Sequence, residues 1–263
     1  MHSHVHFHRA TRARGFGQAI RLLPPDPAPL RVYRDPEVLV DTGFGHLVRW
    51  HLSGGPWPAS PSAAIGPLKS FHYAILAPGA TWPVHVHEDT QAITYVIAGA
   101  LEHSDSLGNR GVLTSGGVQQ RWLGWGTEHR EWNPSESERV EFIRLWLAVP
   151  QADPISSERQ SHYGADQRSG RWLRIAQSEC WPSDGLMVAQ DARVHVARID
   201  PSNGPVPYHF DPGHGGYAYV IEGDVEANLE RLQTGDAARV LSEGELQVHA
   251  LHTTELMLVD VPL

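Results

Sequence analysis

The sequence has only one cysteine, Cys180, among its 263 residues. A single cysteine excludes an intrachain disulfide and any zinc or iron–sulfur site built from several thiolates. This low cysteine content fits a reducing compartment, and we expect a cytoplasmic protein. The chain also lacks a run of about 18 apolar residues, which a membrane-spanning helix requires. Met1 to Arg14 contain no apolar segment typical of a secretion signal, so we expect no association with a membrane.

An excess of positive charge is absent as well, because the formal net charge is −9 at pH 7. Proteins that hold nucleic acids usually present a basic patch to the phosphates. Direct binding to nucleic acid is therefore disfavoured.

Histidine, by contrast, is abundant, with 17 residues. Its side chain is a common ligand of transition metals. Four histidines alternate near the start of the chain, but such a pattern at a terminus is more typical of a frayed segment than of a site. We treat residues 1–30 as a His-rich extension; its alternating histidines are His2, His4, His6 and His8.

Short apolar runs separated by turn residues indicate the fold. Proline occurs 20 times and glycine 25 times, between runs such as Phe71–Leu76, Ala92–Ile97 and Val140–Val149. Short runs with frequent turn signals favour an all-β barrel or sandwich. The last run, VEFIRLWLAV, begins with alternating apolar residues, as in a strand with one face in a core. We expect few helices, all of them short.

Two segments resemble each other, Thr94–Leu101 (TYVIAGAL) and Ala218–Val225 (AYVIEGDV). Matching aromatic, β-branched and glycine positions indicate a duplicated strand and turn. Between them lies the polar segment Gln151–Gly170, which has the composition of a linker. The sequence therefore predicts two similar β domains, residues 31–160 and 161–263.

Two pairs of polar residues in the first domain have metal-ligand spacing. His85 and His87 are two residues apart, and so are His129 and Glu131. Residues two apart on a strand point to the same face, so each pair can reach one ion. An HxH pair alone is more often structural; the second pair makes the metal site the better interpretation. Three imidazoles and a carboxylate suit a divalent ion of iron, nickel, copper, manganese, cobalt or zinc and leave positions open for catalysis.

Alternatives to this ligand set exist. Gln91 lies four residues after His87, but an amide binds transition metals more weakly than a carboxylate. In the second domain, two side chains stand at the same offsets before Tyr219 as His85 and His87 do before Tyr95. No acidic residue follows His249 at the required spacing, so a degenerate second barrel is the expectation. The candidate residues of this second site are His209, Asp211 and His249.

Tryptophans gather around the ligand segments. They could contact a flat organic substrate or simply fill the barrel. Trp125, which lies between two glycines, is the one we expect to touch substrate. The tryptophans are Trp82, Trp122, Trp125, Trp132 and Trp146.

Several of these motifs together resemble the pirin family and the bacterial pirin-like quercetinases. The motifs are His85-Val86-His87 with Thr94-Tyr95-Val96, the segment EHSDSLGN at 102–109, and Gly124-x-Gly126-x-x-His129-x-Glu131. The resemblance implies two cupin barrels of the double-stranded β-helix or jelly-roll type. It also implies one metal in the first barrel, held by His85, His87, His129 and Glu131, and usually none in the second.

The resemblance further implies activity like that of quercetin 2,3-dioxygenase, whereas animal pirins are iron-dependent partners of transcription regulators. Departures from the family pattern bear on the substrate. The usual HPH is here HVH, a usual glutamate is Gln91, and the usual Trp/Met-containing strand reads Gln119-Gln120-Arg121-Trp122.

Our first hypothesis is an oxygenase with one divalent metal, iron before the others, that acts with O₂ on a phenolic or enolic small molecule. Glu131 would serve as ligand and could also accept a substrate proton. The alternatives are a redox- or metal-sensing regulator with a protein partner, and a metal-assisted isomerase or cyclase of a secondary metabolite. Only the oxygenase would consume O₂ stoichiometrically with substrate.

Overall fold

The structure, a computed structural model, describes residues 30–43, 45–53, 62–85, 90–123, 128–149, 157–178, 185–242 and 244–263. Strands dominate these residues, and the helical elements among them are two short 3-10 turns, Asp35–Glu37 and Pro201–Asn203. The prediction of an all-β protein with few, short helices is confirmed. None of the helices in the described ranges has the length and apolar character needed to cross a membrane.

The first barrel combines a seven-stranded and a four-stranded sheet. Their strand orders are β12-β9-β6-β11-β4-β3-β2 and β5-β10-β7-β8. The strand pairs described in this barrel are all antiparallel. Its strands are β2 (Leu39–Gly43), β3 (His46–Ser53), β4 (Leu68–Leu76), β5 (Thr81–His85), β6 (Thr90–Ala98), β7 (Ala100–Asp105), β8 (Arg110–Thr114), β9 (Gly117–Leu123), β10 (His129–Trp132), β11 (Val140–Ala148) and β12 (Ser157–His162).

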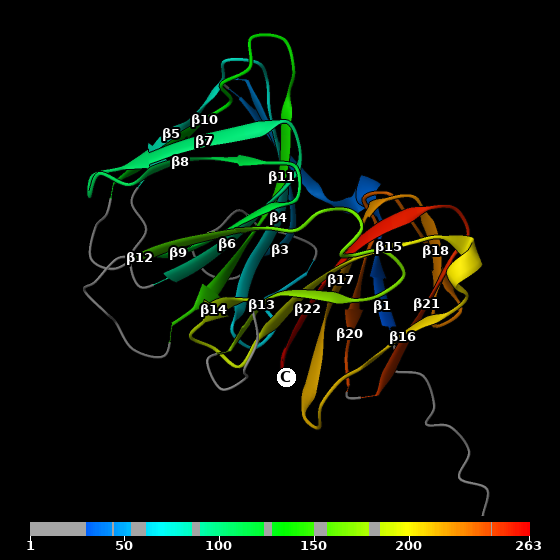
Figure 1. Ribbon diagram of the computed structural model, residues 1–263. Coiled ribbons are helices and arrows are strands. Elements are labelled where there is room, and N and C mark those ends of the chain that lie inside the picture. Colours follow the sequence, from blue (N-terminus) through cyan, green and yellow to red (C-terminus); the bar gives the residue numbers. More distant parts are fainter. Residues whose placement is uncertain are drawn as a thin grey trace, which may run out of the picture.

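The second barrel repeats this plan and lies beside the first (Figure 1). Its sheets have the orders β1-β20-β17-β22-β15-β13-β14 and β16-β21-β18-β19. Its strands are β1 (Leu30–Tyr33), β13 (Leu173–Ser178), β14 (Leu186–Val188), β15 (Arg193–Ile199), β16 (Val206–His209), β17 (His214–Glu222), β18 (Asp224–Ala227), β19 (Glu230–Gln233), β20 (Ala237–Val240), β21 (Glu245–Ala250) and β22 (Thr254–Pro262).

Two strands depart from the domain limits read from the sequence. β1, at the start of the range assigned to the first domain, pairs with β20 of the second barrel, and Figure 1 shows it in blue among the orange strands. β12 pairs with β9 of the first barrel and continues to His162, past the predicted boundary at 160. β12 reads SERQSH and is largely exposed, so it lacks the apolar pattern of a strand and has the composition of a linker.

The duplicated turn predicted from the sequence is present in both barrels. Gly99 follows β6 and Gly223 follows β17, with φ angles of +76° and +101°. A Cβ atom at Gly99 would lie 2.5 Å from the carbonyl oxygen of Arg139, and one at Gly223 would lie 2.3 Å from Oγ1 of Thr254. Both turns therefore require glycine for its backbone conformation and for lack of space.

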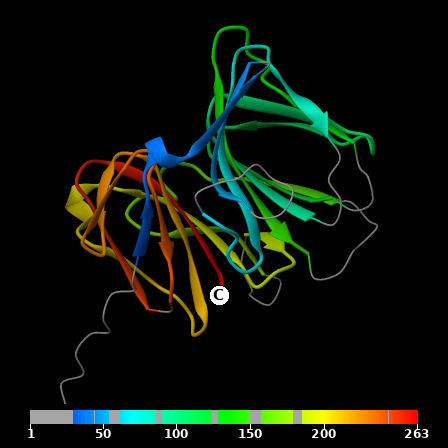
Figure 2. The ribbon, with the colours of Figure 1, turned by 180° about the vertical axis from the view of Figure 1, so that it is seen from behind.

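Apolar side chains of the described residues form three main cores. Two lie inside the barrels; the third lies between the large sheets and contains residues of both barrels. This shared core includes Phe71 and Tyr95 of the first barrel and Tyr217, Tyr219 and Met257 of the second. Seen from behind in Figure 2, the two barrels meet along this junction. The barrels are thus joined by an apolar interface in addition to the connecting chain.

Candidate metal centre

The interior of the first barrel is divided into an apolar layer and a polar layer. Alternate residues of each strand face inward, so one strand can supply both layers. β11 places Val140 and Phe142 in the apolar core and Arg144 and Trp146 beside a small cavity. The described residues that line this cavity are Ala92, Thr94, Gln119, Arg121, His129, Glu131, Arg144 and Trp146.

His129 and Glu131 converge on this cavity from β10. Both are buried, with 4% and 2% of their surface exposed. The cavity has a volume of about 10 Å³, the size that holds one water molecule or ion. In the antiparallel pair of β10 and β5, His129 lies opposite His85. The backbone therefore brings three of the four predicted ligand positions to two neighbouring strands.

The remaining predicted ligand, His87, lies outside the described residues, as do other residues of interest from the sequence. Because the side chain of His85 is not among those described either, the described side chains include no group of three that could hold a metal. The predicted residues outside the described ranges are His2, His4, His6, His8, His87, Trp125 and Cys180.

Glu131 is held by two arginines. Nη2 of Arg144 donates a hydrogen bond of 2.6 Å to its Oε1, and Nη1 of Arg121 lies 3.9 Å from the same oxygen. Burial by itself raises the pKa of Glu131, but the charges of Arg144, Arg121 and His129 and the Arg144 hydrogen bond outweigh it and lower the pKa to about 2. Its second oxygen, Oε2, is buried without a hydrogen-bond partner among the described residues.

The two arginines are themselves fixed by neighbours. Nε of Arg144 donates to Oγ1 of Thr94 at 3.0 Å, and its guanidinium lies over the ring of Phe142, 5.2 Å from the centroid. Nη2 of Arg121 donates to Glu158 at 3.0 Å. Neither arginine stands at metal-ligand spacing in the sequence, so the motifs alone do not indicate either of them as part of the site. The signal for Arg144 was available: a charged residue in the middle of the apolar run Val140–Val149.

This donor set fits a divalent metal ion. A buried carboxylate oxygen without a donor, next to an imidazole and a cavity, is what a cation site offers. Oε1 of Glu131 is meanwhile oriented by Arg144, as outer partners commonly orient metal-binding carboxylates. Gln91, the alternative to Glu131 as a ligand in the sequence, has a different role. Its side chain donates to the carbonyl of Met187 at 3.2 Å and accepts from the backbone of Ala189 at 3.0 Å, so it joins the two barrels.

The tryptophans differ in their positions. Trp146 is buried and lines the cavity. Trp82 packs beside Arg144, whose guanidinium carbon lies 5.8 Å from its ring centroid. Trp132 stacks with Arg130 at 5.5 Å. Among the described tryptophans, Trp146 is therefore the one placed to contact a molecule bound at the centre.

The second barrel is apolar at the equivalent position. Thr94 of β6 lies opposite Gln119 and Arg144 on its two neighbouring strands. The matching Ala218 of β17 lies opposite Ala238 and Leu258, and these three residues belong to an apolar core. The second barrel therefore does not repeat the polar residues at these three positions.

The second-barrel residues considered from the sequence are not brought together. In the β16–β21 pair, His209 lies opposite Glu245 and Val206 opposite Val248, so His209 and His249 are near opposite ends. His209 is 69% exposed, and His249 is exposed on the outer face of β21. Asp211 forms an ion pair with Arg193. The matching sequence spacing of His209 and Asp211 does not bring these residues together with His249, because strand alternation turns His249 outward.

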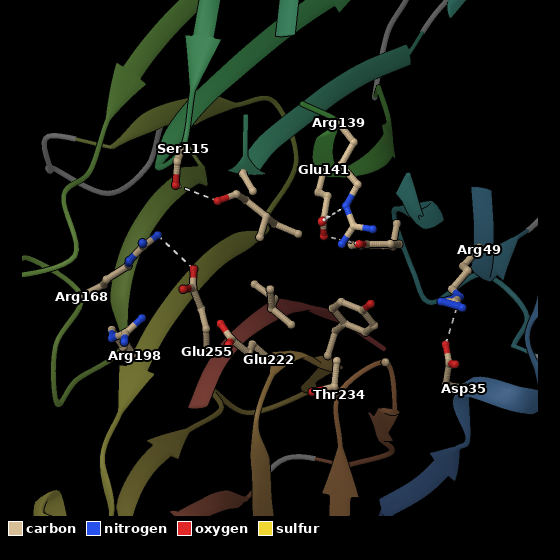
Figure 3. Close-up of a pocket in the computed structure, with 16 residues that line it drawn as sticks. Asp35, Arg49, Ser115, Arg139, Glu141, Arg168, Arg198, Glu222, Thr234 and Glu255 are labelled. Carbon is tan, nitrogen blue, oxygen red and sulfur yellow. Dashed lines mark hydrogen bonds and ion pairs between the residues drawn. The ribbon is translucent and has the colours of Figure 1, made fainter. Parts of the chain in front are cut away.

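A larger cleft of about 560 Å³ lies where the two barrels meet (Figure 3). Arginines and carboxylates line it in equal number, and three ion pairs join them: Arg49 with Asp35, Arg139 with Glu141, and Arg168 with Glu255. The described residues that line this cleft include no histidine. The barrel cavity rather than this cleft therefore offers metal-ligand chemistry.

Comparison with known proteins assigns the family. The pirin family model matches residues 66–147, and the model of the quercetinase C-terminal cupin domain matches residues 178–261. A pirin-like protein of Caulobacter vibrioides is 32% identical over 195 residues, which are 74% of this chain and 83% of that protein. The chain belongs to the pirin family. Quercetin 2,3-dioxygenase of Escherichia coli K12, another relative, is 26% identical over 220 residues, 83% of this chain and 93% of that protein.

Solved pirin structures share the fold. YhhW of Escherichia coli aligns with a TM-score of 0.81 and 21% identity over 89% of this chain and 98% of that chain. The structure of bacterial pirin YhhW in complex with nickel(II) aligns with a TM-score of 0.80 and 20% identity over 89% and 99% of the two chains. The prediction of a pirin-type protein with two cupin barrels is thereby confirmed.

Proposed function

We propose that this pirin-family chain is a metal-dependent oxygenase that acts with O₂ on a phenolic or enolic small molecule. The observation that carries the proposal is the environment of Glu131. Its Oε2 is buried without a hydrogen-bond donor among the described residues, beside His129 and a cavity of the first barrel. The equivalent position of the second barrel is apolar. Buried polar atoms are nearly always satisfied, so an unmet acceptor indicates a missing cation or donor.

The relatives support the reaction class. One is named quercetin 2,3-dioxygenase, and one structural neighbour was solved with nickel(II). We propose His85, His87, His129 and Glu131 as the ligands of one divalent ion, iron or nickel before copper, manganese, cobalt or zinc. When bound, the ion would supply positive charge to an anionic substrate oxygen and an open position for O₂.

The residues of the chain have separate tasks in this proposal. Arg144 fixes Oε1 of Glu131 and leaves Oε2 for the ion. We therefore assign Glu131 to metal ligation rather than to proton transfer, since one of its oxygens already accepts a hydrogen bond from the charged Arg144. The indole of Trp146 and the methyl group of Ala92 form an apolar wall that keeps water from the centre.

Metal content tests the ligand set. The parent is the full-length chain with His2, His4, His6 and His8 replaced by Ala, which removes metal held by the N-terminus. We expect one metal per parent chain by elemental analysis. The His129→Ala variant should lose it, since losing a direct ligand weakens binding beyond the about 10–100-fold typical of outer partners. His209→Ala is the matched control, because that imidazole is 69% exposed on the second barrel, and should retain it. Stoichiometric metal in His129→Ala would refute the ligand set.

Oxygen consumption tests the reaction. The metal-loaded parent is screened in an oxygen electrode against phenolic and enolic compounds, with His129→Ala as the blank. We expect O₂ uptake in a fixed ratio to substrate loss. Conversion of a substrate without O₂ uptake would instead establish the isomerase or cyclase alternative.

A further inference from the structure

A buried histidine outside the ligand set lies next to the candidate metal centre. His103 on β7 has 0% of its surface exposed, and in the β7–β10 pair it lies opposite Glu131. The described lining of the cavity does not include it, and the proposed function gives it no task. Buried polar atoms nearly always have hydrogen-bond partners, so the partners of this imidazole indicate what it does.

One ring nitrogen of His103 binds Arg121 of β9. Nη2 of Arg121 lies 3.1 Å from Nδ1 of His103. Because a guanidinium can only donate hydrogen bonds, Nδ1 is the acceptor, and the neutral ring carries its proton on Nε2. The contact with Arg121 therefore fixes the tautomer of His103.

The other ring nitrogen faces β12, the outermost strand of the large sheet (Figure 1). Nε2 of His103 lies 2.6 Å from the side-chain amide of Gln160 and 3.4 Å from Oε1 of Glu158. Nη2 of Arg121 also donates to Oε2 of Glu158 at 3.0 Å. One carboxylate of the edge strand thus contacts both His103 and Arg121, and the three side chains hold one another in place.

A glycine on β8 leaves the space for this network. Gly111 lies opposite His103 in the β7–β8 pair. A Cβ atom at this position would lie 2.7 Å from Nε2 of His103 and 2.9 Å from the amide nitrogen of Gln160. Gly111 is not among the glycines with positive φ, so the backbone conformation does not require glycine here. The close approach of the His103 ring does.

These contacts keep Arg121 away from the carboxylate of Glu131. Nη1 of Arg121 lies 3.9 Å from Oε1 of Glu131, beyond hydrogen-bond length, while Arg144 donates to that oxygen at 2.6 Å. Without His103, the buried guanidinium of Arg121 would turn to another acceptor. Oε2 of Glu131 is buried beside it without a donor among the described residues. A hydrogen bond to Oε2 would then compete with the metal ion for the same oxygen.

We infer that His103 is a positioning residue of the metal centre, which holds Arg121 together with Glu158 so that Oε2 of Glu131 stays open to the ion. The inference rests on the proposed function, since it takes Glu131 as a ligand. It also gives the exposed edge strand β12 a role at the centre, through Glu158 and without any metal ligand of its own.

Two substitutions at His103 separate positioning from packing. Asparagine keeps an acceptor oxygen close to the place of Nδ1, whereas leucine fills the volume without an acceptor. Each variant is made in the parent that lacks the N-terminal histidines, and its cobalt(II) affinity is measured by competition with a chelator under nitrogen. We expect His103→Leu to weaken cobalt binding at least about tenfold, as outer partners of metal ligands commonly do. His103→Asn should stay within about threefold of the parent, because Arg121 keeps its acceptor.

A role in packing alone predicts the opposite order, since a buried leucine costs less than a buried asparagine. The visible absorption of bound cobalt(II) gives a second measurement, because it reports the coordination geometry. We expect His103→Asn to keep the spectrum of the parent and His103→Leu, saturated with cobalt, to change it.

Glu158→Ala tests the same network from β12. It removes the other described acceptor of Arg121 at a partly exposed position of an edge strand, so the barrel interior keeps its packing. We expect cobalt binding at least about threefold weaker than in the parent. Arg159→Ala is the matched control, because this neighbouring residue of β12 is exposed on the other face, and it should bind like the parent.

The outcomes separate this inference from the proposed function. If the parent takes up no cobalt, both proposals fail. If His103→Leu binds cobalt as tightly as the parent, or if His103→Asn loses more affinity than His103→Leu, the positioning role is refuted and the metal centre stands. Should urea titration show that His103→Leu is unfolded, Glu158→Ala decides alone: weaker binding supports the role of the network, and binding equal to the parent refutes it.

Discussion

Glu131 shows how one side chain can be recognised from spacing and yet be understood only from its contacts. The HxE spacing identified it as a carboxylate near His129. The structure adds that its two oxygens have different surroundings, Oε1 bound by Arg144 and Oε2 buried without a donor in the described part. A carboxylate fixed on one side and open on the other can act as a ligand with one oxygen.

At the residue scale, we predict that Glu131→Gln lowers metal affinity by at least about tenfold while the chain still folds, because an amide is a much weaker ligand for these ions. The substitution also leaves Arg144 without its carboxylate, so we expect a destabilisation of a few kcal/mol, toward the about 3–5 kcal/mol typical of a broken buried pair. Metal titration and urea unfolding measure the two effects.

The exposed Glu136→Gln, in the turn that follows β10, is the control and should change neither quantity. Full metal affinity in Glu131→Gln would remove this residue from the ligand set.

At the scale of elements, the duplicated turn shows which features of a repeat are structural. Gly99 and Gly223 occupy equivalent positions, and in both a side chain would collide with the strand that starts alongside. The polar residues Thr94, Gln119 and Arg144 of the first barrel, by contrast, correspond to Ala218, Ala238 and Leu258 in the second. The repeat conserves the backbone geometry of the fold but not the chemistry of the interior.

We predict that Gly99→Ala destabilises the protein more than Gly108→Ala. Both glycines have positive φ, +76° and +90°, so both substitutions should incur the about 1 kcal/mol penalty of a left-handed residue. At Gly99 the added Cβ would also lie 2.5 Å from a backbone oxygen, whereas at Gly108 nothing lies within 4 Å. Free energies of unfolding from urea titration give the comparison, and equal losses would contradict the steric argument.

At the scale of the whole molecule, the core between the barrels contains a buried histidine. His51 is fully buried and packs against Phe71 and Tyr219, with ring centroids 6.1 and 4.7 Å away. Burial, reinforced by the charge of Arg49, lowers the pKa of His51 from 6.5 to about 3. His195 in the second barrel is also buried, and burial followed by the charges of Arg174 and Arg193 lowers its pKa to about 3.

These histidines predict a loss of stability in mild acid. Between pH 6.5 and 3 the unfolded chain binds a proton at each histidine that the folded chain excludes, so the free energy of unfolding falls as the pH falls. Each group contributes up to about 1.4 kcal/mol per pH unit in this window and nothing above it. Urea unfolding at pH 7.5 and 5.0 should show the decrease.

His51→Gln should make that decrease smaller by up to about 2 kcal/mol, since a glutamine does not titrate. His249→Gln, an exposed histidine, is the control and should leave it unchanged. An identical decrease in the His51 variant would exclude His51 as a source of the pH dependence.

The sequence by itself determined the fold class, the duplication and the family, because these rest on local patterns. Alternating apolar residues, turn glycines and contiguous motifs are properties of neighbouring positions, and they predicted β4, β6 and β11 and the equivalent turns. The pairing of His129 with Glu131 on one strand face was predictable for the same reason, since β-strand alternation is local.

Only the tertiary structure decided which distant residues surround those positions. Arg121 and Arg144 reach Glu131 from other strands, Gln91 contacts the second barrel, and β1 joins a sheet that its sequence position did not indicate. Strand order and register set these contacts, and they depend on pairings between residues far apart in the chain. A local pattern contains no information about such pairings, so the contacts of Glu131 with Arg144 and Arg121 became visible only in the folded barrel.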